Sequence, residues 1–179
     1  MAAQLKILAE GRWPDPDDPD GLQLPPLPGF TASSFNPLVA ETAERCLRAH
    51  HGDRVEPSRT ALLLASHGGD RATALAIDTA AAADRQMPPL LFFQSNPNAV
   101  LGHVAARHRL TGPVVAISPT GTGTPGEVPS DALELAELLL LDGDADQVLV
   151  IAAEPAEHSE HPEHPHRTDR AVAVLVTTA

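Results

Sequence analysis

Residues 90–146 constrain the fold more than any other part of the chain, because apolar runs and helix-like segments alternate there between clear turn signals. Short apolar runs rich in β-branched residues are typical of buried strands, whereas longer segments with apolar residues at every third or fourth position are typical of helices. The pattern predicts a strand at Leu90–Phe93, a helix at Asn98–His108, a strand at Val114–Ser118, a loop at Pro119–Pro129 and a helix at Ser130–Leu141. This alternation indicates an α/β fold.

The flanking segments extend the same pattern. Asn36 as a helix cap, with Pro37 at the first helical position, predicts a helix that places Cys46 on its buried face, and an alanine-rich helix is predicted at Arg71–Arg85. Further strands are predicted at Gln4–Ala9, Thr60–Ser66, Gln147–Ala153 and Arg170–Thr178. We therefore predict one α/β domain over residues 1–179, with a mixed sheet of about five strands and helices on both faces.

Two segments have compositions that predict loops rather than helices or strands. Residues 11–33 are rich in proline and aspartate, and proline lacks the backbone donor that helix interiors and central strands need. We expect Trp13 to anchor this loop. Residues 155–170 are rich in histidine, glutamate and proline, and a histidine-rich segment can also bind zinc or nickel. Prolines oppose a preformed site, so we interpret this segment as an exposed loop and keep metal binding as an alternative. Its candidate ligands are His158, His161, His164 and His166.

Charge and cysteine content limit the partners and the chemistry. Twelve basic residues against 24 acidic residues give a formal net charge of −12, which argues against a nucleic acid or an anionic membrane as a partner. The single cysteine, Cys46, rules out an internal disulfide framework, and an apolar helical cysteine is usually a core residue. The sequence contains no recognisable leader or membrane-spanning run, so we expect a cytoplasmic protein, and we expect no cofactor.

The run SNPNAVLGHVAARHRLTGPVVAIS, followed by an Ala/Leu-rich helix and LLLLDGDADQVLVIAAE, resembles the N-terminal half of a β-ketoacyl synthase of the thiolase-like class. The resemblance implies half of a thiolase-like fold. It also implies a nucleophilic cysteine in the loop after Ser118, at about Gly121 or Gly126 depending on the direction of counting. Neither position holds a cysteine. The family's two catalytic histidines lie in a C-terminal half beyond the region of resemblance.

Without that cysteine, the loop offers only the hydroxyl groups of Thr120, Thr122 and Thr124. A threonine hydroxyl without an adjacent base is a poor nucleophile, so we expect a noncatalytic protein. The resemblance is greatest to chain-length-factor-type partners of polyketide and polyene synthases, although such factors usually carry a glutamine here and this loop has none. It implies a subunit of type II polyketide or fatty-acid-like biosynthesis that acts through association.

Family members dimerise along the strand that follows the Gly–Pro turn, which implies pairing with a ketosynthase or with a second copy of this chain. An acyl carrier protein is a further candidate partner, and an acidic carrier would need a local arginine patch such as Arg107 and Arg109. The Ser130–Leu141 helix is apolar on nearly every side, so we expect it to be buried between other elements. The predicted dimer strand consists of Val114, Val115, Ala116, Ile117 and Ser118.

Two other functions stay open. In the first, Thr120 or Thr122 supports residual acyl-thioester transfer or hydrolysis near His103, and in the second the histidine-rich loop binds a metal. Phe92, Phe93 and Leu101 are candidate walls of a pocket for an acyl chain.

Overall fold

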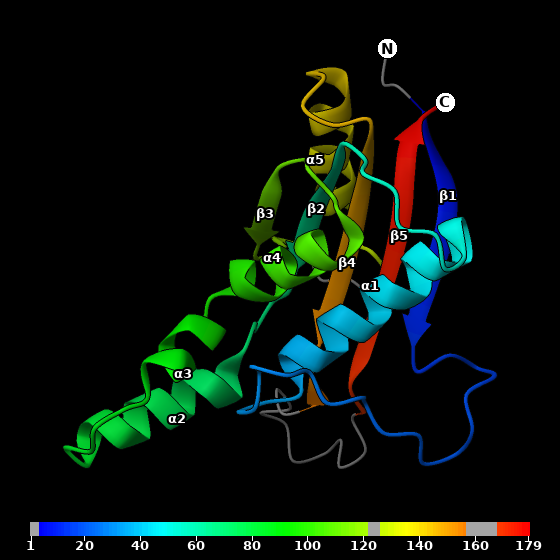
Figure 1. Ribbon diagram of the computed structural model, residues 1–179. Coiled ribbons are helices and arrows are strands. Elements are labelled where there is room, and N and C mark those ends of the chain that lie inside the picture. Colours follow the sequence, from blue (N-terminus) through cyan, green and yellow to red (C-terminus); the bar gives the residue numbers. More distant parts are fainter. Residues whose placement is uncertain (1–3, 122–125, 157–167) are drawn as a thin grey trace.

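The computed structural model describes residues 4–121, 126–156 and 168–179. Its centre is a five-stranded sheet with the strand order β1-β5-β4-β2-β3 (Figure 1). Strand β2 pairs in parallel with β3 and with β4, whereas β5 is antiparallel to both β4 and β1. The predicted mixed sheet is therefore confirmed. The strands are β1 Leu5–Trp13, β2 Thr60–Ala65, β3 Val114–Ile117, β4 Gln147–Glu154 and β5 Arg170–Thr178.

Helices cover both faces of the sheet, because strands that are apolar on both sides need cover on both sides. Helices α1 and α4 lie on one face and α5 lies on the other (Figure 1). Leu62 and Leu64 of β2 belong to the core beneath α1 and α4, whereas the alternate residue Leu63 belongs to the core beneath α5. None of the helices within the described ranges has the length and apolarity needed to cross a bilayer. The helices are α1 Phe35–His51, α2 Arg71–Ala82, α3 Pro89–Gln94, α4 Pro97–His108 and α5 Ser130–Leu141.

Strand β1 is longer than the sequence predicts. It continues through Trp13, so the proline-rich loop begins later than residue 11. Gly11 permits this extension, because a Cβ atom there would lie 2.5 Å from the backbone nitrogen of Cys46 in α1. The absence of a side chain lets β1 approach α1 closely.

The segment Leu90–Phe93, predicted as a strand, lies in helix α3. Pro89 occupies the start of this helix, where its fixed φ favours helical geometry and its missing donor costs nothing. Leu90, Phe92 and Phe93 are exposed, so the run does not enter the sheet. Helices α2 and α3 instead project from the body as a hairpin (Figure 1). We call this hairpin, residues 71–94, the arm.

Asn36 does not cap α1 as predicted. The helix begins at Phe35, and Asn36 is buried, with its amide donating to the Asp70 carboxylate at 3.0 Å and to the Gln94 carbonyl oxygen at 3.3 Å. The Asp70 carboxylate in turn caps α2 by accepting a hydrogen bond from the Thr73 amide at 3.1 Å. This buried polar junction joins the start of α1 to the base of the arm.

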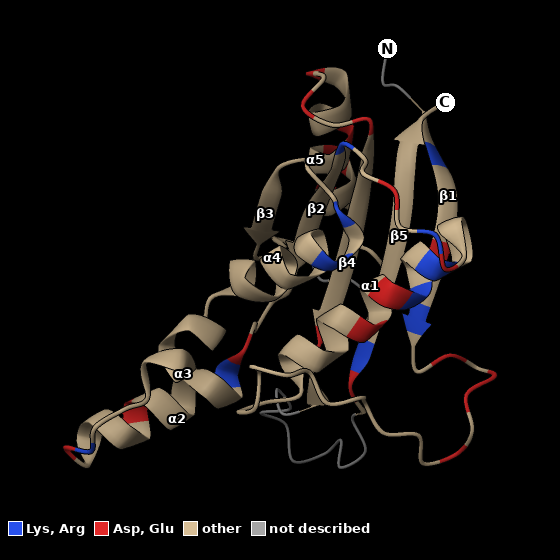
Figure 2. Ribbon diagram, viewed as in Figure 1, with Lys and Arg blue, Asp and Glu red and all other residues tan. Residues whose placement is uncertain are grey.

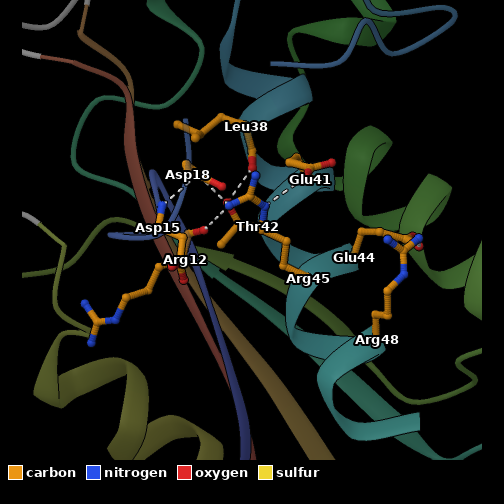
Figure 3. Close-up of polar contacts among 9 residues, drawn as sticks. All are labelled: Arg12, Asp15, Asp18, Leu38, Glu41, Thr42, Glu44, Arg45 and Arg48. Atoms are coloured by element: carbon orange, nitrogen blue, oxygen red, sulfur yellow. Dashed lines mark hydrogen bonds and ion pairs between the residues drawn. The ribbon is translucent and has the colours of Figure 1, made fainter. Parts of the chain in front are cut away.

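The proline- and aspartate-rich loop is held against α1 by Arg45 (Figure 3). The guanidinium of Arg45 lies over the Trp13 ring, 4.4 Å from its centroid, and donates to the Asp18 carboxylate at 2.7 Å and to that of Glu41 at 2.8 Å. It also donates to the backbone oxygen of Arg12 at 3.1 Å. The predicted anchoring role of Trp13 is confirmed, because this side chain is buried in the core.

Candidate functional site

Parallel strands β2, β3 and β4 end at the same edge of the sheet, where the loop after β3 begins. Ala65 of β2 lies in register with Ile117 of β3 and with Ala152 of β4. In open α/β sheets, ligands bind at the carboxyl ends of such strands. Five of the residues described at this edge form what we call the strand-end site: His67, Thr120, Gly121, Asp131 and Glu154.

His67 links the ends of β2 and β4 to the loop. One ring nitrogen, Nε2, donates to the Gly121 carbonyl oxygen at 3.0 Å, and the other, Nδ1, lies 3.1 Å from the Glu154 carboxylate. The backbone amide of His67 donates to the same carboxylate at 2.6 Å. The hydrogen bond to Gly121, with the charge and hydrogen bond of Glu154, raises the pKa of the imidazole above its ordinary value. The site therefore favours a protonated ring.

Thr120 points toward the first turn of α5. Its amide and its hydroxyl both donate to the Asp131 carboxylate, at 2.8 Å and 3.2 Å. The hydrogen bond from the Thr120 amide, with that from the hydroxyl, holds the pKa of Asp131 below its ordinary value. A carboxylate stabilised in this way is a weak base, so the pair does not activate the threonine as a nucleophile.

The two positions where the family resemblance places a cysteine both lie near this edge. The Gly121 carbonyl accepts from His67, and the Gly126 carbonyl accepts from Arg12 of β1 at 3.1 Å. Gly126 has a φ of 91°, which glycine adopts readily and other residues avoid. Thr122 lies outside the described residues.

His103 is not part of the strand-end site. It lies on α4, on the face of the sheet opposite α5, and its ring meets the Phe30 ring edge-on with centroids 6.0 Å apart. The hydrolytic alternative, which pairs Thr120 with His103, therefore lacks its proposed base. Within the described residues, His67 is the histidine that contacts this loop, through the Gly121 carbonyl oxygen.

Cys46 is confirmed as a core residue. It is fully buried, and burial raises the pKa of its thiol to about 12. A thiol of that pKa supplies almost no thiolate at neutral pH. Within the described part of the chain, no group of three His, Cys, Asp or Glu residues is arranged to hold a metal ion. The candidate ligands His158, His161, His164 and His166 lie outside the described residues.

Among the described residues, strand β3 forms one edge of the sheet and pairs only with β2. The Pro113 carbonyl accepts from the Leu62 amide of β2 at 2.9 Å, and the Ile117 carbonyl accepts from the amide of Ser66, the residue after β2, at 3.2 Å. Because strands alternate with a period of two, the backbone donors of Val114 and Ala116 face away from β2. An unpaired edge of this kind is a template for pairing with another strand.

The arm exposes large apolar side chains. Phe92 and Phe93 are 66% and 68% exposed, and Leu75 is 68% exposed. Leu101 is fully buried in the core, so the acyl pocket expected between it and the two phenylalanines does not form. Figure 2 shows few charged residues along the arm, which leaves an apolar surface on the side of the molecule that carries β3.

Helix α5 is buried on one side only, which corrects the expectation that it lies between other elements. Ala132, Ala136 and Leu140 face the sheet. Leu138 and Leu141 are 54% and 55% exposed. The helix therefore presents apolar residues to the outside, because nothing in the described part of the chain packs on that side.

Comparison with known proteins gives structural matches alone, since no family model and no curated protein matches this sequence. A ketosynthase in complex with its chain length factor from Xenorhabdus doucetiae superposes with a TM-score of 0.67 at 20% identity, over 98% of this chain and 79% of that chain. The fold is that of a ketosynthase-like protein. The predicted half of a thiolase-like fold is thereby confirmed.

Two further structures share this ketosynthase-like fold. The ishigamide ketosynthase/chain length factor matches with a TM-score of 0.69 at 18% identity, over 89% of this chain and 49% of that chain. A β-ketoacyl synthase from Burkholderia phymatum STM815 matches with a TM-score of 0.68 at 13% identity, over 99% of this chain and 59% of that chain. This chain thus spans about half to three fifths of these two relatives.

Proposed function

We propose that this chain is a noncatalytic ketosynthase-like subunit that associates with a ketosynthase in type II polyketide or fatty-acid-like biosynthesis. The observation that carries the proposal is the free edge of β3, whose outward backbone donors have no partner in the sheet. A strand from another chain of the same architecture would satisfy them. The exposed apolar arm lies on the same side and would enlarge the contact.

The strand-end site supports the noncatalytic part of the proposal. The thioester chemistry of a ketosynthase requires a thiolate, and glycine stands at both candidate positions, Gly121 and Gly126. The one cysteine is buried in α1, and the Thr120 hydroxyl is hydrogen-bonded to an ionised carboxylate. These residues are consistent with a structural role, in which their contacts hold the loop in place and none of them acts as a nucleophile.

The structural relatives support the associative part. Two of them are ketosynthases with their chain length factors, so this fold pairs with a ketosynthase in other proteins. The aligned part of the Xenorhabdus doucetiae chain makes up 79% of it, so that chain is itself only modestly longer than this one. A short ketosynthase-like chain therefore has a precedent within such a complex.

The test is to block the free edge of β3 without disturbing the pairing with β2. Ala116→Pro removes an outward-facing donor and leaves the inward-facing positions Val115 and Ile117 intact. We expect the variant to keep the thermal stability of the isolated chain and to lose co-purification with a co-expressed ketosynthase. Light scattering of the purified proteins measures the complex.

Ala116→Thr is the matched control, because threonine keeps the donor and suits a strand. It should bind as the wild type does. If the proline variant binds a ketosynthase equally well, or if the wild type binds none, association through β3 is wrong.

A further inference from the structure

A cavity lies at the edge of the sheet opposite the strand-end site. It forms where the last turns of α1 and α4 meet the segment that leads into β2, and its volume is about 290 Å³. Its apolar wall consists of Leu47 and Val55. Its polar lining is mainly basic and includes Arg48, His51, Arg54, Arg107 and His108.

Glu44 organises the basic side chains of this cavity. Its carboxylate accepts from Arg48 at 2.9 Å, from Arg107 at 3.0 Å and from His108 at 2.8 Å. Burial raises the pKa of Glu44, but the hydrogen bonds and charges of Arg107 and His108 outweigh it and hold the pKa below its ordinary value. The carboxylate is thus ionised and positions two guanidinium groups. Figure 3 shows Glu44 and Arg48 together on α1, away from the Asp18–Arg45 contact.

The positive charge of the cavity is only partly neutralised. The Nε of Arg107 donates to the Glu44 carboxylate, which leaves the two terminal nitrogens of Arg107 for another acceptor. The side chains of Arg107 and Arg48 are 61% and 60% exposed. Arg54 is exposed and has no polar partner in the described residues. Asp53 lies 3.7 Å from Arg48, but is itself 96% exposed. In a chain with a net charge of −12, such a concentration of arginines needs an explanation.

Helix capping does not account for these contacts. Basic residues near helix C-termini usually interact with the last carbonyl groups. Here Arg48, Arg107 and His108 bind the Glu44 side chain. Burial lowers the pKa of His51, and the neighbouring His50 and His108 lower it further, while Glu56 opposes them. The geometry and the charge both favour an anionic ligand.

We propose that this cavity binds the phosphate group of a small phosphorylated molecule. A guanidinium presents paired donors that match phosphate oxygens, and a phosphate carries enough charge and acceptors to engage Arg107 and Arg54 together. Val55, which is 44% exposed, supplies an apolar surface for the organic part of the ligand. This site is separate from the β3 edge, so its existence does not depend on association with a ketosynthase.

The test uses inorganic phosphate as the probe. The His51 ring is titrated by NMR in phosphate and in chloride at equal ionic strength, because a bound anion stabilises the imidazolium and should raise the pKa of His51. Phosphate affinity is obtained from the same resonance at fixed pH. Arg107→Gln should weaken binding by about tenfold or more. Arg54→Gln should also weaken it, and as an exposed residue without a polar partner it leaves the fold intact.

Arg85→Gln is the matched control, because Arg85 is an exposed arginine on the arm, away from the cavity. It should leave phosphate affinity unchanged. An equal loss of affinity in Arg85→Gln would show nonspecific attraction and overturn the proposal. A pKa of His51 that is the same in phosphate and in chloride would overturn it as well.

Discussion

His67 is the residue whose role depends most on the folded chain. It holds the loop after β3 through Gly121, 54 residues away, and binds Glu154, 87 residues away. No local sequence pattern predicts such contacts, because they arise only when parallel strands bring their ends to one edge of the sheet. The sequence identifies His67 as a residue after a strand. Its function as a link between three segments requires the register of the sheet.

The raised pKa of His67 predicts how stability depends on pH. A histidine whose pKa is raised by folding contributes stability that is fully present below its ordinary value of 6.5 and is lost as the pH rises through the folded-state pKa. Glu154→Gln removes the carboxylate partner, so the pKa of His67 should fall and the melting temperature should decline less steeply above pH 6.5. Thermal melts over a pH series, with NMR titration of His67, measure both effects.

Glu127→Gln is the control for the loss of one charge near the same loop. Glu127 is exposed and makes no polar contact with His67 in the described part of the chain, so the pH dependence should match that of the wild type. An unchanged pKa of His67 in Glu154→Gln would contradict the assigned contact.

Asn36 shows the limit of local capping rules. An asparagine before a proline at a helix start predicts a cap, and the helix does form there. The amide is used instead for Asp70 and Gln94, which belong to the base of the arm. Burial of a polar side chain requires partners, and those partners come from distant segments. The helix was therefore predictable, whereas the role of its asparagine was not.

Among the elements, the buried strands were the most predictable. Strands β2, β4 and β5 are continuous apolar runs, and helix cover on both faces follows directly from that composition. The error at Leu90–Phe93 has a physical cause, since a short apolar run is compatible with a strand or a helix. Pro89 favours the helix, and the exposure of Phe92 and Phe93 is visible only in the structure.

The exposed arm predicts a separation between stability and association. Replacing Phe92 and Phe93 together by serine should change the unfolding free energy of the isolated chain by less than about 0.5 kcal/mol for each substitution, since both side chains are largely exposed. Affinity for a ketosynthase should fall by about tenfold or more if the two rings are buried in the complex. Denaturant melts measure the first quantity and titration calorimetry the second.

Leu101→Ser provides the comparison in the adjacent helix. Leu101 is fully buried, so this variant should lose about 2–5 kcal/mol of unfolding free energy. Wild-type affinity in the Phe92/Phe93 variant would exclude the arm from the contact with the partner.

At the scale of the whole molecule, the chain folds as half of a larger architecture. The sheet is complete enough to form a core on each face, with α1 and α4 over one and α5 over the other. The described residues leave the β3 edge, the arm and the outer side of α5 uncovered. The outer side of α5, a helix rich in leucine, is therefore exposed.

The outer side of α5 yields a prediction that separates an isolated chain from an assembled one. Leu138 and Leu141 are exposed, so replacing both by glutamate should change the unfolding free energy of the monomer by about 1 kcal/mol or less. Replacing Leu140, which faces the sheet, by glutamate should lower the unfolding free energy by several kcal/mol, because this variant buries an unpaired charge. Light scattering and denaturant melts of the three proteins provide the comparison.

If the double variant is as unstable as Leu140→Glu and the wild type is oligomeric, the outer side of α5 is already covered by a second copy. If the double variant is a stable monomer that no longer binds a ketosynthase, the same surface is where the partner packs, and the chain completes its core through that complex.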